Sequence, residues 1–160
     1  MKSGWRYPPA LADRIIGPGY SQNKNSDYRI SAEKMRERVI DEILELLNHT
    51  NRENEIDRDK YPQVLSSAMN FGLPARRFFS GPEETHRTED DIRTAILRFE
   101  PRVIPETLIV RILQPSPNRQ QKGTLTVEIS AMIYWHPQPL DLYLKGHYDK
   151  DTRRISMMQR

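Results

Sequence analysis

Glu100, Pro101 and Arg102 are the residues best suited to specific chemistry, because they directly follow an amphipathic segment at residues 88–99. Proline cannot continue an α-helix, and it pushes the residue before it toward extended geometry. Glu100 and Arg102 are therefore expected at a corner with little backbone freedom. A carboxylate and a guanidinium held in this way can recognise a partner through charge-assisted, bidentate hydrogen bonds. The corner is thus a candidate recognition site.

The same two charges allow two other interpretations. They could form an ion pair inside the domain that serves stability alone, because ion pairs at helix ends are common and often weak. They could also belong to a glycoside hydrolase site, which needs a carboxylic acid with a raised pKa across a cleft from an ionised partner. The neighbouring Arg102 favours the charged form of Glu100 and opposes a role as general acid. The other carboxylates considered are Glu106, Glu83, Glu84, Asp90 and Asp91. Since they complete no catalytic constellation, we expect no enzyme.

No motif predicts a metal, a cofactor or a nucleophile. The chain has no cysteine, which excludes a disulfide, a thiolate metal ligand and a thiol nucleophile. It also lacks a glycine-rich phosphate loop and a Gly-x-Ser-x-Gly elbow. The histidines are dispersed, without the His-x-x-x-His spacing of a local metal signature: His49, His86, His136 and His147. We therefore expect no cofactor and no metal.

Composition indicates one soluble domain. A chain of 160 residues is long enough for one domain with a core and too short for two comfortable ones. The net charge of +3 comes from 25 basic and 22 acidic residues, whereas nucleic-acid binders concentrate Lys and Arg on one face. No apolar stretch approaches the roughly 20 residues of a membrane-spanning helix, and residues 1–20 lack a signal-peptide core. We expect a cytoplasmic protein that binds no nucleic acid and does not insert into a membrane.

The first elements expected along the chain, which must position the corner, are helices. Residues 31–48 show a broad apolar stripe, with Ser31 as a good N-cap and Asn48 as a plausible stop. A second short helix is expected around residues 64–69, ending near Gly72, which can take the left-handed conformation of a helix end. The first half of the chain is therefore expected to be helical.

The period of the apolar residues changes after the third helix. That helix is expected over residues 88–99, with Thr88 and Asp91 as an approximate capping box and Pro101 as its stop. The period then falls from about 3.6 to 2, which predicts strands. The first, residues 108–113, is apolar on both faces and is expected to be buried on both. Later strands are expected at residues 125–133 and 140–145, with a short strand or a tail at 153–158.

This order of elements predicts an α+β domain, with N-terminal helices packed on a C-terminal, mainly antiparallel sheet. We expect a single domain over residues 31–150 and a C-terminal strand or tail over residues 151–160. Residues 1–30 are rich in Pro, Gly, Asn, Ser and Tyr without a sustained period, and are expected to form a flexible arm. The aromatic residues of the arm could anchor it to a partner or dock on the domain's own surface.

Four segments resemble a known family in the expected order. Residues 99–103, Phe-Glu-Pro-Arg-Val, resemble the Phe-Glu-Pro-Arg-Leu signature of TssE, the type VI secretion baseplate subunit related to the wedge protein of contractile phages once labelled a lysozyme. Residues 46–48 resemble its Leu-Leu-Asn, and residues 67–74 resemble its Ser-x-x-Asn-Tyr-Gly-Leu-Pro. The strands expected at 125–133 and 140–144 resemble its closing antiparallel strands. The resemblance covers about residues 31–148.

The resemblance implies a structural role without catalysis, in which the subunit joins the baseplate wedge and nucleates the contractile sheath. It implies that residues 100–102 contact the wedge core of TssF and TssG, with Arg98, Asn70 and Gly72 as further candidate contacts. TssK is another implied partner, and the sheath proteins TssB and TssC would pair with a sheet edge by β-augmentation. The implied place is the cytoplasm, in a baseplate docked at the inner membrane complex. A peptidoglycan-cleaving lysozyme-like enzyme and a regulatory adaptor of the same fold remain as alternatives.

Overall fold

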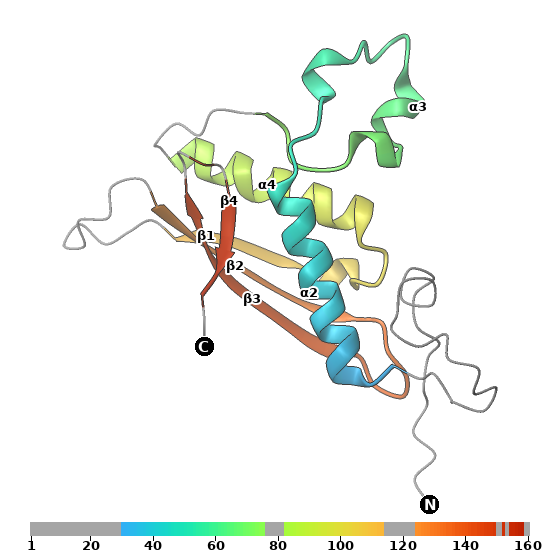
Figure 1. Ribbon diagram of the computed structural model, residues 1–160, viewed down its shortest axis with the longest axis vertical. Coiled ribbons are helices and arrows are strands. Elements are labelled where there is room, and N and C mark those ends of the chain that lie inside the picture. Colours follow the sequence, from blue (N-terminus) through green and yellow to red (C-terminus); the bar gives the residue numbers. More distant parts are fainter. Residues whose placement is uncertain (1–29, 76–81, 114–123, 150–151, 153, 159–160) are drawn as a thin grey trace, which may run out of the picture.

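The computed structural model describes residues 30–75, 82–113, 124–149, 152 and 154–158. Two long helices, α2 (Ala32–Asn48) and α4 (Pro82–Phe99), pack on one face of a four-stranded antiparallel sheet (Figure 1). The strands follow one another across the sheet in chain order: β1 (Ile109–Leu113), β2 (Thr124–Ile133), β3 (Leu140–Asp149) and β4 (Arg154–Met157). This arrangement confirms the predicted α+β fold. The arm expected at residues 1–30 lies outside the described residues, apart from its last residue.

Helix α2 has the bounds that its end signals predict. The Ser31 side chain accepts a hydrogen bond from the backbone N–H of Lys34 at 3.2 Å, which caps the first turn. The helix ends at Asn48. Its apolar stripe turns into the core, where the fully buried residues are Val39, Ile43, Leu46 and Leu47. The stripe therefore holds α2 against the sheet by the burial of apolar surface.

Helix α4 begins at Pro82, so the predicted start at Thr88 is wrong. Proline is favoured at the first helical position, and Glu83 and Glu84 in the first turn complement the helix dipole. Thr88 lies inside the helix, where its hydroxyl donates to the carbonyl of Glu84 at 2.7 Å instead of capping. The predicted end is confirmed, since α4 stops at Phe99.

The predicted second helix is in fact two short pieces, α3 (Pro62–Leu65) and η2 (Ala68–Asn70). Ser66 and Ser67 separate them, because each hydroxyl donates to a carbonyl of the preceding turn, at 3.1 and 2.8 Å. Together with η1 (Glu53–Glu55), these pieces form a lobe, residues 51–73, that projects beyond the helix and sheet layers (Figure 1).

The sheet buries only the face that the helices cover. Ile112 of β1 is 7% exposed, whereas Ile109 and Leu113 on the opposite face are 49% and 43% exposed. The expectation that both faces of this strand are buried is therefore wrong, because α2 and α4 lie on the same side. The other buried hydrophobic residues of the helix-facing side are Val127, Ile129, Ala131, Ile133, Leu142, Leu144, Tyr148 and Ile155.

The open face of the sheet carries a row of charges. The register places Arg111 opposite Glu128 and Glu128 opposite Lys145. The ammonium of Lys145 donates to Glu128 at 2.6 Å. This hydrogen bond, with the positive charges of Lys145 and Arg111, lowers the pKa of the Glu128 carboxyl, and Glu128 in turn raises the pKa of Lys145. The pair stabilises neighbouring strands across the solvent-facing surface.

Side chains from the helices form hydrogen bonds with backbone groups at both edges of the sheet. At β1, the N–H of Ile112 donates to the Glu89 carboxylate at 2.8 Å, and Arg93 donates to the carbonyl of Leu108. At β4, the Asn48 amide donates to the carbonyl of Ile155 at 3.1 Å and accepts from its N–H at 2.7 Å. These contacts cover part of the edges that would otherwise be open to another strand.

Candidate functional site

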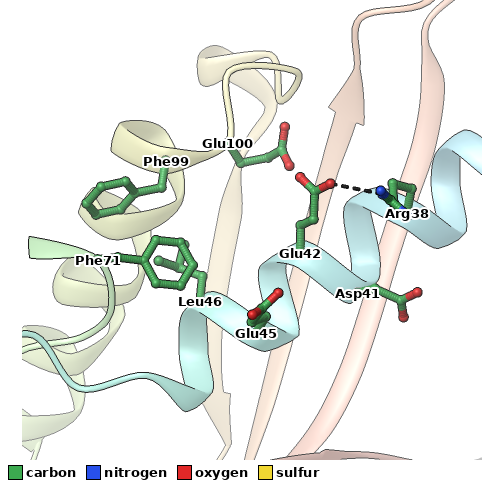
Figure 2. Close-up of a pocket in the computed structure, with 8 residues that line it drawn as sticks. All are labelled: Arg38, Asp41, Glu42, Glu45, Leu46, Phe71, Phe99 and Glu100. Atoms are coloured by element: carbon green, nitrogen blue, oxygen red, sulfur yellow. Dashed lines mark hydrogen bonds and ion pairs between the residues drawn. The ribbon is translucent and has the colours of Figure 1, made fainter. Parts of the chain in front are cut away.

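A groove lies between α2 and α4, beside the predicted corner (Figure 2). Its volume is about 510 Å³. The apolar floor is made by Leu46 of α2, Phe71 of the lobe and Phe99, the last residue of α4. The charged side chains that line it are Arg38, Asp41, Glu42, Glu45 and Glu100. The groove therefore combines an aromatic floor with an acidic rim, and it reaches the corner at Glu100.

The aromatic floor is built by edge-to-face packing. The ring centroids of Phe71 and Phe99 are 5.3 Å apart with an interplanar angle of 66°. His49 also packs edge-to-face on Phe71, with the ring centroids 5.4 Å apart. Such pairs add attraction beyond the burial of their area. The packing fixes the lobe against the ends of both helices.

The backbone of the corner is tied to the end of β2. The N–H of Glu100 makes the last helical bond, to the carbonyl of Ile96 at 2.8 Å. The chain then turns at Pro101, which is exposed. The carbonyl of Arg102 accepts from the N–H of Tyr134 at 2.8 Å, and Val103 pairs with the end of β2. The proline turn thus leads directly from the helix to the sheet, as the sequence predicts.

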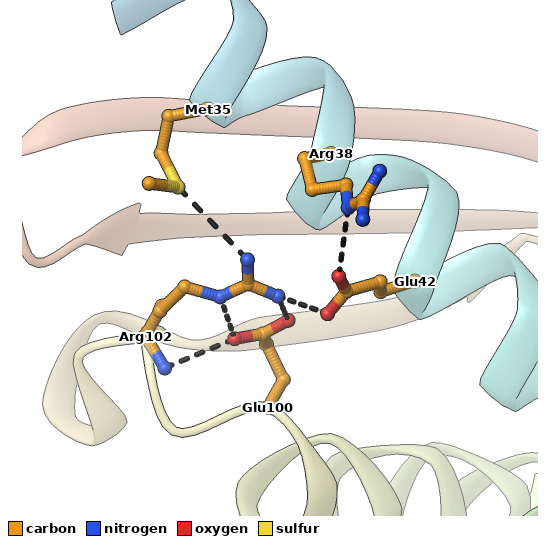
Figure 3. A network of polar contacts seen from close by, with 5 residues as sticks. All are labelled: Met35, Arg38, Glu42, Glu100 and Arg102. Atoms are coloured by element: carbon orange, nitrogen blue, oxygen red, sulfur yellow. Dashed lines mark hydrogen bonds and ion pairs between the residues drawn. The ribbon is translucent and has the colours of Figure 1, made fainter. Parts of the chain in front are cut away.

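Glu100 and Arg102 form a bidentate ion pair (Figure 3). One carboxylate oxygen of Glu100 accepts from the backbone N–H of Arg102 at 3.0 Å and from its Nε at 2.7 Å, and the other accepts from Nη2. The Glu100 side chain is only 3% exposed, whereas that of Arg102 is 25% exposed. Both oxygens of the buried carboxylate are therefore used inside the domain.

Arg102 also links the corner to α2. Its Nη2 donates to Glu42, whose other oxygen accepts from Arg38 at 3.2 Å, so that charges of opposite sign alternate (Figure 3). Its Nη1 lies 3.9 Å from the sulfur of Met35. Burial acts to lower the pKa of Arg102, but the hydrogen bonds and charges of Glu100 and Glu42 outweigh it and raise the pKa. The network holds α2, the end of α4 and the sheet together.

The structure therefore contains the internal ion pair that the sequence offered as an alternative to partner recognition. It also leaves part of the corner accessible, because Pro101 is exposed and Arg102 is a quarter exposed. Contact with a partner through the corner stays a prediction. Any such contact must fall on these two residues, since Glu100 is buried.

The further candidates Arg98, Asn70 and Gly72 all serve the lobe. The side chains of Asn70 and Arg98 donate to the same carbonyl, that of Leu65, at 3.1 and 3.0 Å. Gly72 has a φ of +114°, and a Cβ there would lie 2.5 Å from the carbonyl oxygen of His49. Their contact with a partner also stays a prediction.

A short stretch of paired backbone, which we call the lobe anchor, holds the lobe to the end of α2. It consists of His49, Asn51, Gly72 and Leu73. The N–H of Asn51 donates to Leu73 and the N–H of Leu73 donates to His49, both at 2.8 Å. The buried Asn51 amide adds a bond to the carbonyl of Gly72 at 3.1 Å. The anchor thus depends on neutral groups in close contact.

Sequence reasoning missed Glu42 and Asn48 as functional parts of the fold. The sequence signal for Glu42 is its spacing of four residues from Arg38, which indicates an ion pair along the helix. Its contact with Arg102 spans 60 residues of chain, so no local pattern reveals it. Asn48 was expected only to end the helix, whereas its amide also binds β4.

The described residues assemble no catalytic or metal-binding cluster. Glu106 lies exposed on η3 (Pro105–Thr107), outside the groove. The other carboxylates that were weighed lie along α4. In the described ranges, no three His, Asp or Glu residues come close enough to hold a metal ion. None of the helices described is long and apolar enough to cross a membrane.

The family comparison agrees with this architecture. The family model of the baseplate wedge protein gp25 matches residues 33–138, which is more than half of the chain and includes the corner, the groove and the lobe. Comparisons with curated proteins and with solved structures gave no match. TssE belongs to the matched family, so the resemblance at residues 99–103 is confirmed at the family level. The chain is a member of the baseplate wedge protein gp25 family, a family of structural baseplate subunits.

Proposed function

We propose that this protein is the TssE-like baseplate subunit of a type VI secretion machine, where it joins the wedge core and nucleates the contractile sheath. Membership of the gp25 family supports a wedge subunit. The ordered resemblances at residues 46–48, 67–74 and 99–103 support the narrower assignment. The observation that carries the proposal is the corner, which is rigid and charged and still presents Pro101 and Arg102 at the surface.

The corner binds the wedge core of TssF and TssG through its accessible side. Glu100 holds the Arg102 guanidinium in one orientation from within the domain. The Nη1 of Arg102 contacts the sulfur of Met35, which is a weak acceptor. Its N–H groups can therefore donate to a carboxylate or carbonyl of a partner. Glu100 is thus a positioning residue, and Arg102 makes the contact.

The lobe supports the same interface. It presents Met69, which is 83% exposed, and Tyr61, which is also exposed. Exposed apolar and aromatic side chains of this kind serve as anchors in protein interfaces. The conformation of the lobe is stabilised from within the domain by Asn70, Gly72 and Arg98, so their part in wedge binding is indirect.

Sheath nucleation uses an edge of the sheet, with TssB and TssC as partners and TssK as a further contact of the baseplate. Strand addition forms main-chain hydrogen bonds with unpaired backbone groups. At the β4 edge, an incoming strand must displace Asn48 from Ile155, and at the β1 edge it must displace Glu89 from Ile112. The assembly takes place in the cytoplasm, in a baseplate docked at the inner membrane complex.

Co-purification with TssF and TssG tests the proposal. Arg102→Lys keeps the positive charge beside Glu100 but loses the planar fork, so we expect a folded protein that retains less than a tenth of the wedge proteins. Loss of a buried, hydrogen-bonded interfacial charge contact costs about 2–5 kcal/mol, which is more than tenfold in affinity, and lysine cannot present the two donors of the fork in the same geometry. The matched control is Arg87→Ala, which removes another arginine of an ion pair on α4.

Normal recovery of TssF and TssG with a folded Arg102→Lys protein would contradict the role of the corner. Incubation with peptidoglycan tests the enzymatic alternative. Release of fragments that is lost in Glu100→Gln would overturn the proposal. A single soluble partner in place of the wedge proteins would identify an adaptor.

A further inference from the structure

We infer that the groove between α2 and α4 receives an arginine or lysine side chain, presented beside an apolar residue by a segment of a partner protein. The groove adjoins Glu100, so this inference deepens the proposed function and rests on it for the identity of the partner. It names the chemistry that the partner must bring.

The floor suits an apolar or cationic group. Leu46, Phe71 and Phe99 supply apolar surface, and aromatic rings attract cations through their electron-rich faces. The guanidinium of Arg98 already lies 5.9 Å from the ring centroid of Phe99, so this ring interacts with a cation within the domain. The volume of about 510 Å³ falls in the range of pockets that hold whole small ligands, which is about 300–1,000 Å³. One side chain does not fill it, so the occupant brings a neighbour.

The rim selects a positive charge. Arg38 and Arg102 are engaged with Glu42 and Glu100, which leaves Asp41 and Glu45. Neither of these two carboxylates forms an ion pair with any residue that the structure describes. A partner that brings a carboxylate to this rim would meet repulsion, whereas a guanidinium or ammonium would be attracted.

Repulsion between carboxylates along α2 also favours the binding of a cation. Glu33, Glu37, Asp41 and Glu45 follow one another at four-residue spacing on the exposed side of the helix, and they have no ion-pair partner in the described part of the chain. Like charges at this spacing destabilise a helix. A cation seated between Asp41 and Glu45 removes that repulsion on binding. The free protein therefore carries an unfavourable interaction that a basic partner relieves.

The chemistry of the groove also favours a protein segment over a metal ion. Its carboxylates are spread along the helix, and no metal-binding cluster of three or more His, Asp or Glu occurs among the described residues. Its floor is apolar and would gain nothing from a hydrated ion. A basic residue beside an apolar one satisfies the rim and the floor together, since long basic side chains lay their stems on apolar surface while the head stays polar.

A peptide titration of the full-length protein, labelled with ¹³C in its phenylalanine rings, tests the inference. The probes are acetyl-Arg-Leu-amide, acetyl-Lys-Leu-amide, and acetyl-citrulline-Leu-amide, which keeps the shape of arginine without its charge. We expect saturable shifts of the Phe71 and Phe99 resonances with the first two probes, and at least about fivefold weaker binding of the third. Phe71→Leu assigns the resonance, and we expect it to weaken arginine binding about two- to fivefold.

Charge variants locate the cation. We expect Asp41→Asn and Glu45→Gln each to weaken the arginine peptide by about two- to fivefold, as for exposed ion pairs. The matched control is Glu106→Gln, which neutralises an exposed carboxylate outside the groove and is expected to leave the affinity unchanged. Thermal melts confirm that each variant is folded. The affinity is also expected to fall as NaCl is added.

Three outcomes would overturn the inference. The first is equal binding of the arginine and citrulline peptides. The second is unchanged affinity in the Asp41→Asn/Glu45→Gln double variant. The third concerns the chain's own first segment, whose basic residues are Lys2, Arg6, Arg14, Lys24 and Arg29. If their replacement by glutamine in the full chain shifts the Phe71 and Phe99 resonances without added peptide, the occupant is that segment and not a partner.

The inference and the proposed function can fail separately. If the arginine peptide does not bind, yet TssF and TssG co-purify with the wild-type protein and not with Arg102→Lys, the groove inference is wrong and the corner proposal stands. If the peptide binds as expected while TssF and TssG do not co-purify with the wild-type protein, the groove chemistry stands and the wedge assignment is wrong.

Discussion

The corner and the lobe anchor each fix the chain directly after a long helix, the corner after α4 and the anchor after α2, but they use different chemistry. The corner relies on the ionised pair of Glu100 and Arg102, whereas the lobe anchor relies on the Asn51 amide, on paired backbone and on the close approach of Gly72. Charge attraction acts over several ångströms and tolerates the partial exposure of Arg102. Close packing fails when a single atom is added. The charged groups of the corner can therefore also contact a partner, whereas the lobe anchor serves only to hold the lobe to α2.

Gly72→Ala should show the largest effect, because it attacks close packing directly. The added Cβ would lie 2.5 Å from the carbonyl oxygen of His49, and the φ of +114° is strained for any residue with a side chain. We expect a loss of about 3 kcal/mol in the free energy of unfolding, measured by urea denaturation. Ser66→Ala, an exposed change in the same lobe, is the control. A loss below about 1 kcal/mol would mean that the anchor accommodates the added atom, so that close packing does not limit it.

Glu100→Ala tests the ionic side of the comparison. It leaves the Arg102 guanidinium beside the core without its main partner. Breaking a fully buried pair costs about 3–5 kcal/mol, and the partial exposure of Arg102 reduces our expectation to about 2 kcal/mol. Glu106→Ala, at an exposed site, is the control for the loss of a carboxylate. Equal stability of the two variants would show that the internal pair contributes nothing.

The two regions also differ in how far the sequence predicted them. The proline turn at Pro101 and the helix end near Gly72 are local signals, and both were predicted. The partners that complete each region were not, because the Arg102–Glu42 contact and the packing of Gly72 on His49 join distant parts of the chain. Local pattern specifies where the chain turns, and tertiary packing decides what the turn contacts.

The strands and the helix starts show the same limit of local sequence patterns. The alternation in β2 predicted that strand closely, since one face is buried and the other is not. The same rule failed for β1, where Ile109 and Leu113 look like core residues but face solvent. The start of α4 was missed because the Thr88 cap was preferred over the helix-starting signals at Pro82.

Asn51→Ala should have a smaller effect on the lobe anchor. It removes the amide bond to the carbonyl of Gly72 and leaves that buried group without this donor. We expect a loss of about 1 kcal/mol in the free energy of unfolding. The two variants should also differ in their salt dependence. The cost of Asn51→Ala should be the same at low salt and at 1 M NaCl, while the cost of Glu100→Ala should shrink. Equal salt dependence of the two variants would contradict the assignment of neutral and ionic chemistry.

Glu128→Gln on the open face of the sheet should have the smallest effect and serves as a reference for a half-buried ion pair between two strands. The pKa of Glu128 is lowered, mainly by the hydrogen bond from Lys145. Its contribution to stability is therefore fully present above the ordinary carboxyl pKa and is lost as the pH falls through the lowered value. Thermal melts at neutral and strongly acidic pH should show a small difference between wild type and variant that disappears in acid. A difference that grows in acid would contradict the sign of the shift.

The amide of Asn48 has a consequence for any strand that joins β4. It donates one hydrogen bond to the carbonyl of Ile155 and accepts one from its N–H, as the backbone of a residue in a neighbouring strand would. An incoming strand at this position therefore exchanges two hydrogen bonds for two others, with no net gain in their number. The driving force for joining must come from the side chains that are buried at the same time. At Ile155, backbone hydrogen bonds therefore do not favour the pairing of free copies of the subunit, and the side chains determine which partner joins the strand.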